Sequence, residues 1–226
     1  MKKLFLGLGL VAGTFAFAQT SPTFGLKAGL NVSSISDDGY EDSKAKAGFY
    51  GGIFMNAPIS EMFSIQPEVL YSQMGAKITE RGSGTVAGSD YSYRLSSSTN
   101  LDYITVPVMF QFNATPNFYL EAGPEFGFLI SAKARNSSYT NVEGNFDADS
   151  YDSDSRDIKD NFSGFNMGAA LGLGFNFTQN FGINARYVAG FTDISKKNNG
   201  EDGNTTLEQS GKNRNNAFQV GLSYKF

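Results

Sequence analysis

Five charged residues carry the chemistry that the regular segments of this sequence can offer. They are Lys27, Glu68, Glu121, Glu125 and Arg186. Each lies on the polar side of a stretch in which apolar and polar residues alternate, a pattern typical of a β-strand. Counted from the aromatic residue that begins each stretch, the five lie at similar heights. Because an unpaired charge is costly to bury, we predict one hydrogen-bonded lumen charge network centred on Arg186.

Catalysis is not the expected chemistry of these residues. The chain contains no histidine and no cysteine, which removes the usual general base, the commonest metal ligand and any thiol nucleophile. Glu121 and Glu125 share one strand face but would lie about 13 Å apart, farther than the carboxylate pairs of glycosidases. We therefore predict a protein that is not an enzyme and has no cofactor.

A second group of acidic residues lies in the polar segment 134–161. It contains Asp147, Asp149, Asp152 and Asp154. Their carboxylate oxygens could bind Ca²⁺, but the segment lacks the glycine and the closing glutamate of an EF-hand loop. We predict a solvated loop here, with a calcium-binding loop as the alternative.

Eight segments show the alternation of a strand with one apolar and one polar face. They are 24–32, 48–56, 63–74, 101–112, 118–131, 165–177, 181–194 and 217–226. Pro67, Pro107 and Pro124 fall in three consecutive segments. Proline has no backbone donor for the ladder, which predicts a local break or a bulge at these positions.

The connections between the segments alternate in length. Polar loops are predicted over 34–46, 79–99, 134–161 and 195–214, whereas 57–62, 113–117 and 178–180 are short turns. An up-and-down meander then has every long loop at one end, as in outer-membrane barrels. The predicted fold is all-β, an eight-stranded antiparallel up-and-down transmembrane β-barrel.

Aromatic residues mark the short-turn end of nearly every segment. They are Phe24, Phe63, Phe112, Phe118, Phe177 and Phe181, joined by Phe226 at the end of the chain. This arrangement is typical of an aromatic girdle at a membrane interface. The alternative is a soluble barrel of lipocalin type, which would turn the same apolar rows inward. The glycine-rich polar rows favour the membrane form, since they leave room for large inward side chains.

The first residues have the pattern of a secretory signal peptide. Lys2 and Lys3, an apolar run and Ala16-Phe17-Ala18 precede Gln19, which predicts cleavage after Ala18. The expected organisation is a signal peptide over 1–18 and a single barrel domain over 19–226. The formal net charge of −4 becomes more negative when the two lysines are removed, which argues against a nucleic acid partner.

Two stretches and the chain end resemble a known group of proteins. The stretch 66–72 (Gln-Pro-Glu-Val-Leu-Tyr-Ser), the stretch 101–108 (Leu-Asp-Tyr-Ile-Thr-Val-Pro-Val) and the terminal Phe226 are similar to small outer-membrane β-barrel proteins of Bacteroidetes, including PorT-like and porin-family members. The resemblance implies a Gram-negative outer membrane, with its lipid and the barrel-assembly machinery as partners. It also implies that the last strand, with Phe218, Tyr224 and Phe226, is the assembly signal. It carries over no catalytic residue.

Three functions remain open from the sequence. A barrel with a side-chain-filled lumen would have a structural or surface-interaction role, with an extracellular partner for its long loops. The alternatives are a narrow porin-like channel for small solutes and an accessory component of a protein secretion machine. We expect a monomer in each case.

Overall fold

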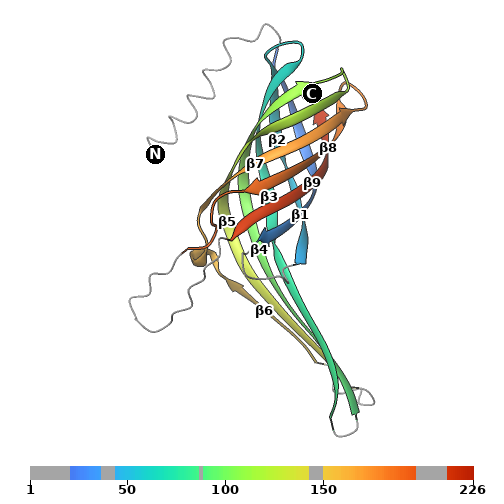
Figure 1. The fold of residues 1–226 in the computed structure, drawn as a ribbon, viewed down its shortest axis with the longest axis vertical. Helices are drawn as coiled ribbons and strands as arrows, with labels where there is room; N and C mark the ends of the chain where they lie inside the picture. The colour runs from blue at the N-terminus through green and yellow to red at the C-terminus, as the bar shows by residue number, and fades with distance from the viewer. Residues whose placement is uncertain (1–20, 37–43, 87–88, 143–149, 197–212) are drawn as a thin grey trace.

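A computed structural model of the chain describes residues 21–36, 44–86, 89–142, 150–196 and 213–226 (Figure 1). The strands are β1 (Thr23–Ser36), β2 (Lys44–Pro58), β3 (Phe63–Val86), β4 (Ser89–Asn113), β5 (Phe118–Val142), β6 (Ser150–Asp157), β7 (Phe165–Asn176), β8 (Phe181–Gly190) and β9 (Arg214–Lys225). A short 3-10 helix, η2, spans Lys159–Asn161. No helix in the described ranges is both long and apolar enough to cross a membrane. The predicted signal peptide, 1–18, lies outside the described residues.

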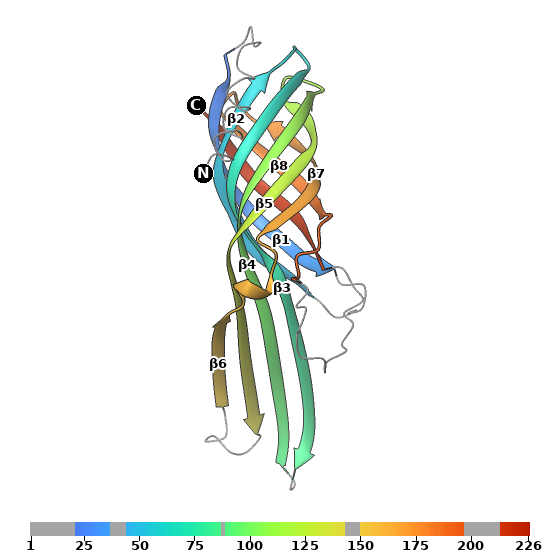
Figure 2. The same cartoon turned by 90° about the vertical axis from the view of Figure 1, so that its left-hand side faces the viewer.

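Eight of the strands close into a ring of antiparallel neighbours. The order around the ring is β1-β2-β3-β4-β5-β7-β8-β9, and β9 pairs again with β1. β6 lies outside the ring, where it pairs with β5. The short connections after β2, β4 and β7 all lie at one end of the ring (Figures 1 and 2). The predicted eight-stranded up-and-down barrel is confirmed.

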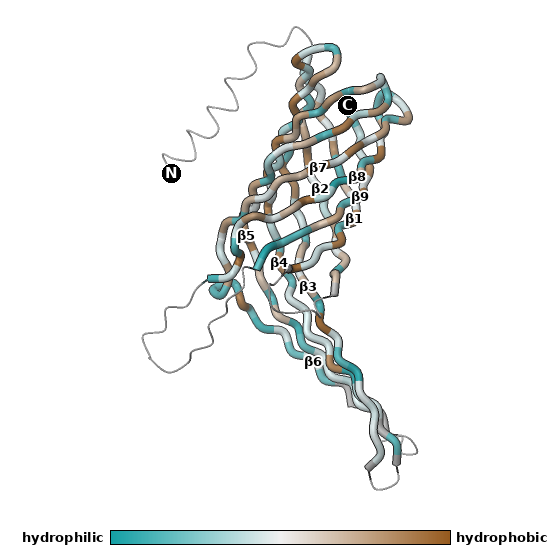
Figure 3. The backbone as a smooth tube through the Cα atoms, in the orientation of Figure 1, coloured by the Kyte–Doolittle hydropathy of each residue, from teal (hydrophilic) through white to brown (hydrophobic). Residues whose placement is uncertain are grey.

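The barrel wall has polar side chains on its inner face and apolar side chains on its outer face, the reverse of a soluble barrel. Inward side chains such as Glu68 and Arg186 are polar, and they expose 1% and 2% of their surface. Outward side chains such as Leu30 and Leu171 are apolar and expose 69% and 67%. Figure 3 shows apolar residues recurring along the barrel strands. Apolar surface is stable against hydrocarbon and unfavourable in water, so the wall is that of a transmembrane barrel.

Two of the predicted loops are wrong where the structure describes them. β3 and β4 continue as a paired hairpin through nearly all of the segment 79–99. β5 continues to Val142 and pairs with β6, inside the predicted loop 134–161. Continuous backbone pairing between Ser-, Thr- and Tyr-containing strands holds these segments, although neither face is strongly apolar. Residues 37–43 and 197–212, in the other two predicted loops, lie outside the described residues.

These prolonged strands form a four-stranded sheet that projects from the end of the ring opposite the short turns (Figures 1 and 2). We call it the extension, and it comprises 77–86, 89–100, 133–142 and 150–157. β3, β4 and β5 contain 24, 25 and 25 residues. Because a tilted strand crosses a bilayer in about 9–11 residues, about half of each strand lies beyond the hydrocarbon core.

Gly75 lies where β3 leaves the ring. Its φ is 141°, and a Cβ at this position would overlap the carbonyl oxygen of Thr99 on β4. Glycine alone accepts this combination of backbone angle and close approach. The close approach of β3 and β4 at the base of the extension therefore depends on a residue without a side chain.

Pro67 and Pro107 interrupt the pairing of their strands without shifting it, whereas Pro124 stays paired with Ala169 on β7. Pairing of β3 with β4 stops at Pro67 and resumes at Leu70 in the same register. Pairing of β4 with β5 stops at Pro107 and resumes at Phe110, also in the same register. The predicted local break is present at both sites. The register shift between β4 and β5 lies elsewhere, at Asp102, so these two prolines cause a break in the pairing and not a bulge.

Candidate functional site

Four of the five charged residues singled out in the sequence meet inside the barrel. Lys27 comes from β1, Glu68 from β3, Glu121 from β5 and Arg186 from β8. Strand alternation points all four inward, and each exposes 2% of its surface or less. We call these four residues the lumen network.

The guanidinium group of Arg186 is the centre of the lumen network. Its Nη1 and Nη2 donate to the two carboxylate oxygens of Glu68 at 3.0 and 2.8 Å, and its Nε donates to Oε1 of Glu121 at 2.8 Å. Nζ of Lys27 donates to Oε1 of Glu68 at 2.6 Å. Two cations therefore face two carboxylates, and the paired fork of Arg186 fixes their geometry.

Gly172 on β7 provides the space between Glu121 and Arg186. Its Cα is the cross-strand partner of Glu121 on one side and of Arg186 on the other. A Cβ on Gly172 would lie 2.9 Å from Oε1 of Glu121 and 2.7 Å from the carbonyl oxygen of Ala185. The glycine-rich inward row of β7 therefore makes room for the ion pairs.

Amide side chains extend the lumen network toward the short turns. Nε2 of Gln66 donates to Oε1 of Glu68 at 2.8 Å, and Nε2 of Gln111 donates to Oε2 of Glu121 at 3.1 Å. Nδ2 of Asn56 donates in turn to Oε1 of Gln111 at 2.8 Å. Sequence reasoning had not singled out these amides, although each lies on the polar face of a predicted strand. Side chains therefore fill the lumen on this side of Arg186, as the diameter of an eight-stranded barrel allows.

A buried apolar cluster occupies the interior on the side of the extension. It comprises Met74, Leu101, Tyr103, Met109, Leu129, Ala132, Ala170, Val188, Ile194 and Ala217. Met74 and Leu101 are cross-strand partners at the base of the extension. The hydroxyl of Tyr103 accepts a hydrogen bond from Nδ2 of Asn215 at 3.2 Å. The interior on this side thus combines an apolar cluster with buried polar side chains such as Asn31 and Asn166.

Glu125 does not join the lumen network. Its side chain is inward and buried, but its Oε2 has no hydrogen-bond partner, and no ion pair in the described part of the chain involves it. The donors of Arg186 are directed to Glu68 and Glu121, and Glu125 lies four residues beyond Glu121 on β5. The sequence predicted its height in the barrel but not its position across the lumen.

Two of the four aspartates considered as calcium ligands lie in the described part of the chain, and both are on a strand. Asp152 and Asp154 are exposed on β6, and Asp147 and Asp149 lie outside the described residues. The predicted loop is therefore wrong for 152 and 154. Across the described ranges, no three acidic, histidine or cysteine side chains are close enough together to hold a metal ion.

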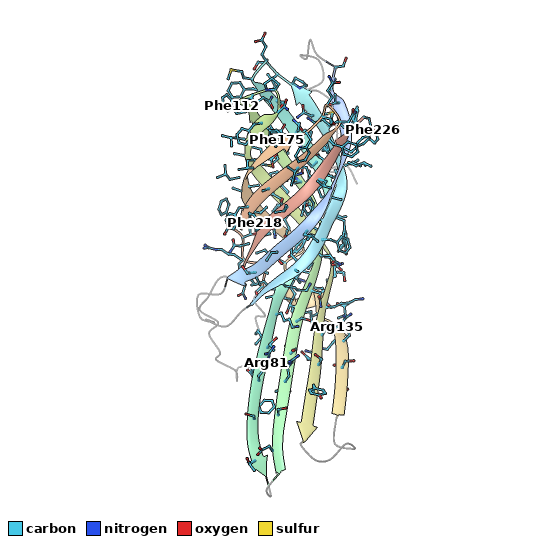
Figure 4. All side chains as sticks on the ribbon, turned by 90° about the vertical axis from the view of Figure 1, so that its right-hand side faces the viewer. Arg81, Phe112, Arg135, Phe175, Phe218 and Phe226 are labelled. Atoms are coloured by element: carbon cyan, nitrogen blue, oxygen red, sulfur yellow. The ribbon has the colours of Figure 1, made fainter. Side chains whose placement is uncertain are left out.

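The predicted girdle residues lie on the outer surface near the short turns. Phe24, Phe63, Phe177 and Phe181 expose 53–59% of their surface, and Phe112 and Phe118 are half-buried. Ring centroids lie 5.4 Å apart for Phe63–Phe112 and 4.8 Å apart for Phe181–Tyr224. Phe218 and Tyr224 of β9, and Phe226 directly after it, are also exposed, and Figure 4 shows Phe112, Phe175 and Phe226 toward the same end.

One protein family and several solved structures are similar to this chain. The family model described as "Outer membrane protein beta-barrel domain" matches residues 17–196. Similar solved structures include Ail of Yersinia pestis, at 15% identity over 92% of this chain and 100% of that chain with a TM-score of 0.43. Others are Neisserial surface protein A, at 13% identity, 92% and 100% coverage and 0.43, and OprG of Pseudomonas aeruginosa, at 13% identity, 92% and 98% coverage and 0.34. No curated protein matches the chain significantly.

Proposed function

We propose that this chain, which belongs to the outer membrane protein beta-barrel domain family, forms a closed, non-enzymatic barrel. In this proposal the barrel presents an interaction surface outside the cell. The length of β3, β4 and β5 is the observation that carries this proposal. Those strands are more than twice as long as a membrane crossing needs, and their outer halves form the extension. A folded sheet beyond the membrane offers a larger and more rigid surface than flexible loops would.

The contents of the lumen support a closed barrel. The lumen network ties four strands together across the interior, and the apolar cluster follows on the side of the extension. A steady path for solutes would require both to move. A surface-interaction role therefore fits the geometry better than transport.

The way the chain reaches the membrane forms part of the same proposal. The signal peptide 1–18 would direct export, and outer-membrane lipid would surround the apolar wall. The barrel-assembly machinery would read the last strand through Phe218, Tyr224 and Phe226. The protein would act as a monomer, within the Bacteroidetes group that it resembles.

A narrow channel for small solutes is the second candidate. Buried polar atoms of Thr105, Glu125 and Gln219 have no hydrogen-bond partner in the described protein. Buried groups of this kind are usually satisfied by water, and a chain of water would favour conduction. A role as accessory to a secretion machine would instead require the extension to bind another protein.

Labelling of intact cells tests the placement of the extension. The chain has no cysteine, so Thr79→Cys in the extension and Gln179→Cys in a short turn each create a single thiol. A maleimide that cannot cross the membrane should label Thr79→Cys on whole cells and Gln179→Cys only after the outer membrane is permeabilised. The reverse result would overturn the proposed surface role.

A further inference from the structure

The extension has two chemically different faces. Directly opposite residues of antiparallel strands lie on the same side of a sheet. Lys77, Ser98 and Arg135 form one such row across β3, β4 and β5. Arg81, Arg94 and Tyr139 form another row on the same side, four residues farther along each strand. We call this side the basic face; Figure 4 labels Arg81 and Arg135.

The opposite face carries the other sign of charge. Glu80, Asp152 and Asp154 line a common hollow there with Ile78 and Leu95. Arg156 on β6 also belongs to this side, because it pairs with Ala134, which pairs with Thr99. Neither of the two rows named above contains an acidic residue on β3, β4 or β5, although Asp157 on β6 lies on this side as the cross-strand partner of Lys133.

The basic face continues the lipid-facing wall of the barrel. The register of β3 with β4 is unchanged from the short turn to the tip. The extra residue at the β4–β5 register shift belongs to β5, so alternation along β4 is unbroken. Outward Phe110 is therefore on the same side as Arg94, whereas inward Leu101 is on the side of Leu95. A surface that begins as apolar wall thus becomes cationic beyond the membrane.

The cations of this surface are accessible. Lys77, Arg81, Arg94, Lys133, Arg135 and Lys159 are all exposed. None of them takes part in an ion pair within the described ranges. Among the described residues of β3 to β6, Asp90, Asp102 and Asp157 are the acidic residues on the same side, so cations are in excess there. Nζ of Lys159 lies 2.9 Å from the carbonyl oxygen of Ile130, at the edge of the apolar band.

The heights of these cations above the membrane indicate what kind of ligand would fit the basic face. Lys133 lies three residues beyond Ile130, or about 10 Å along the strand, near the headgroup layer that adds roughly 5–8 Å to each side of the hydrocarbon core. Arg94 lies ten residues beyond Ile104, about 33 Å along β4 and well outside that layer. The hydroxyl groups of Thr79, Ser96 and Tyr139 lie along the way. A matching ligand has anionic groups at the bilayer surface and a sugar chain that continues outward.

We propose that the basic face binds an anionic glycolipid of the surrounding outer leaflet. Its phosphate groups contact Lys77, Lys133 and Arg135, and its sugar chain follows Arg81 and Arg94. Guanidinium groups pair well with phosphate and carboxylate. Continuity with the lipid-facing wall selects a membrane-borne ligand over a soluble one. This inference rests on the proposed function only in placing the extension outside the cell.

A binding titration with a matched control tests the proposal. Refolded full-length protein in neutral detergent is titrated with fluorescent lipopolysaccharide, a phosphorylated glycolipid, and binding is read as anisotropy. We expect binding that weakens with salt, and a triple variant, Lys77→Gln/Arg81→Gln/Arg135→Gln, that loses about fivefold in affinity per removed cation. Arg156→Gln removes a cation from the opposite face and should bind within about twofold of wild type. Heat-dependent gel mobility confirms that each variant is folded.

Two further ligands test whether the phosphate groups and the lipid part of the glycolipid are each needed for binding. Dephosphorylated lipopolysaccharide should bind much more weakly than the intact molecule, and so should the soluble polysaccharide without its lipid. Equal affinity of wild type and folded triple variant would overturn the basic face as the site. Equal affinity of the soluble polysaccharide and the intact glycolipid would overturn a membrane-borne ligand. Because the titration uses purified protein, its failure is distinguishable from a reversed whole-cell labelling pattern, which would overturn the proposed function instead.

Discussion

Arg186 on β8 and Glu68 on β3 are 118 positions apart in the chain, yet the guanidinium of one donates two hydrogen bonds to the carboxylate of the other. β3 and β8 are on opposite sides of the ring. The pair therefore joins opposite walls and crosses the lumen. Glu121 and Lys27 complete the charge balance on either side of it.

Removing Arg186 should destabilise the barrel strongly. Arg186→Ala leaves the buried carboxylates of Glu68 and Glu121 with one cation, Lys27, and breaking a buried pair in this way costs about 3–5 kcal/mol. Urea unfolding of the lipid-reconstituted protein, followed by gel mobility, measures the loss. Arg81→Ala, in the exposed extension, is the control and should change the free energy of unfolding by less than about 0.5 kcal/mol. Equal stability of the two variants would contradict a buried network.

Adding one methyl group at Gly172 should also destabilise the barrel. Its Cβ would press on Oε1 of Glu121 and on the backbone of Ala185, and overpacking of this kind costs about 1–3 kcal/mol. Gly51→Ala is a matched control, because the nearest atom to its Cβ would be 3.6 Å away, an ordinary contact. The same unfolding assay should rank Gly172→Ala well below Gly51→Ala. If Gly172→Ala is instead the more stable variant, the ion pairs of the lumen network do not depend on the absence of a side chain at Gly172.

The barrel strands and their order could be predicted because two patterns can be read directly along the sequence. Alternation fixes which residues share a face, and this was sufficient to find the eight ring strands and the inward charges. The alternation of long and short connections was sufficient to find the up-and-down topology. The inward position of Lys27, Glu68, Glu121 and Arg186 followed from parity and height alone.

The extension could not be predicted by the same reasoning. Its segments alternate only weakly. In 89–98, Tyr91, Tyr93 and Leu95 share one parity, but serines occupy both parities, so the apolar face is short. Serine and glycine also made 79–99 similar to a loop. Only the pairing of two such segments with each other defines the strands, and pairing is a long-range property. The separation of Glu125 from the lumen network could not be predicted for a related reason. The sequence gives the height of a residue along the barrel axis but not its distance from a residue on the opposite wall.

Deleting Phe226 should lower the amount of barrel in the outer membrane while synthesis continues. The residue directly follows β9 and exposes 70% of its surface, where assembly machinery could read it. Phe177→Ala is the control, because Phe177 lies at the same end with similar exposure but in the interior of the chain. Surface labelling of Thr79→Cys in each background measures the yield. Unchanged labelling after the deletion would contradict a role in assembly.

Single-channel recording tests the closed lumen most directly. Wild-type protein, shown to be folded by its heat-dependent gel mobility, is inserted into planar lipid bilayers at known protein-to-lipid ratio. Because the lumen network and the apolar cluster fill the interior, we predict no steady current across the physiological voltage range. A reproducible open current from folded wild-type protein would contradict the closed barrel and establish the narrow channel in its place.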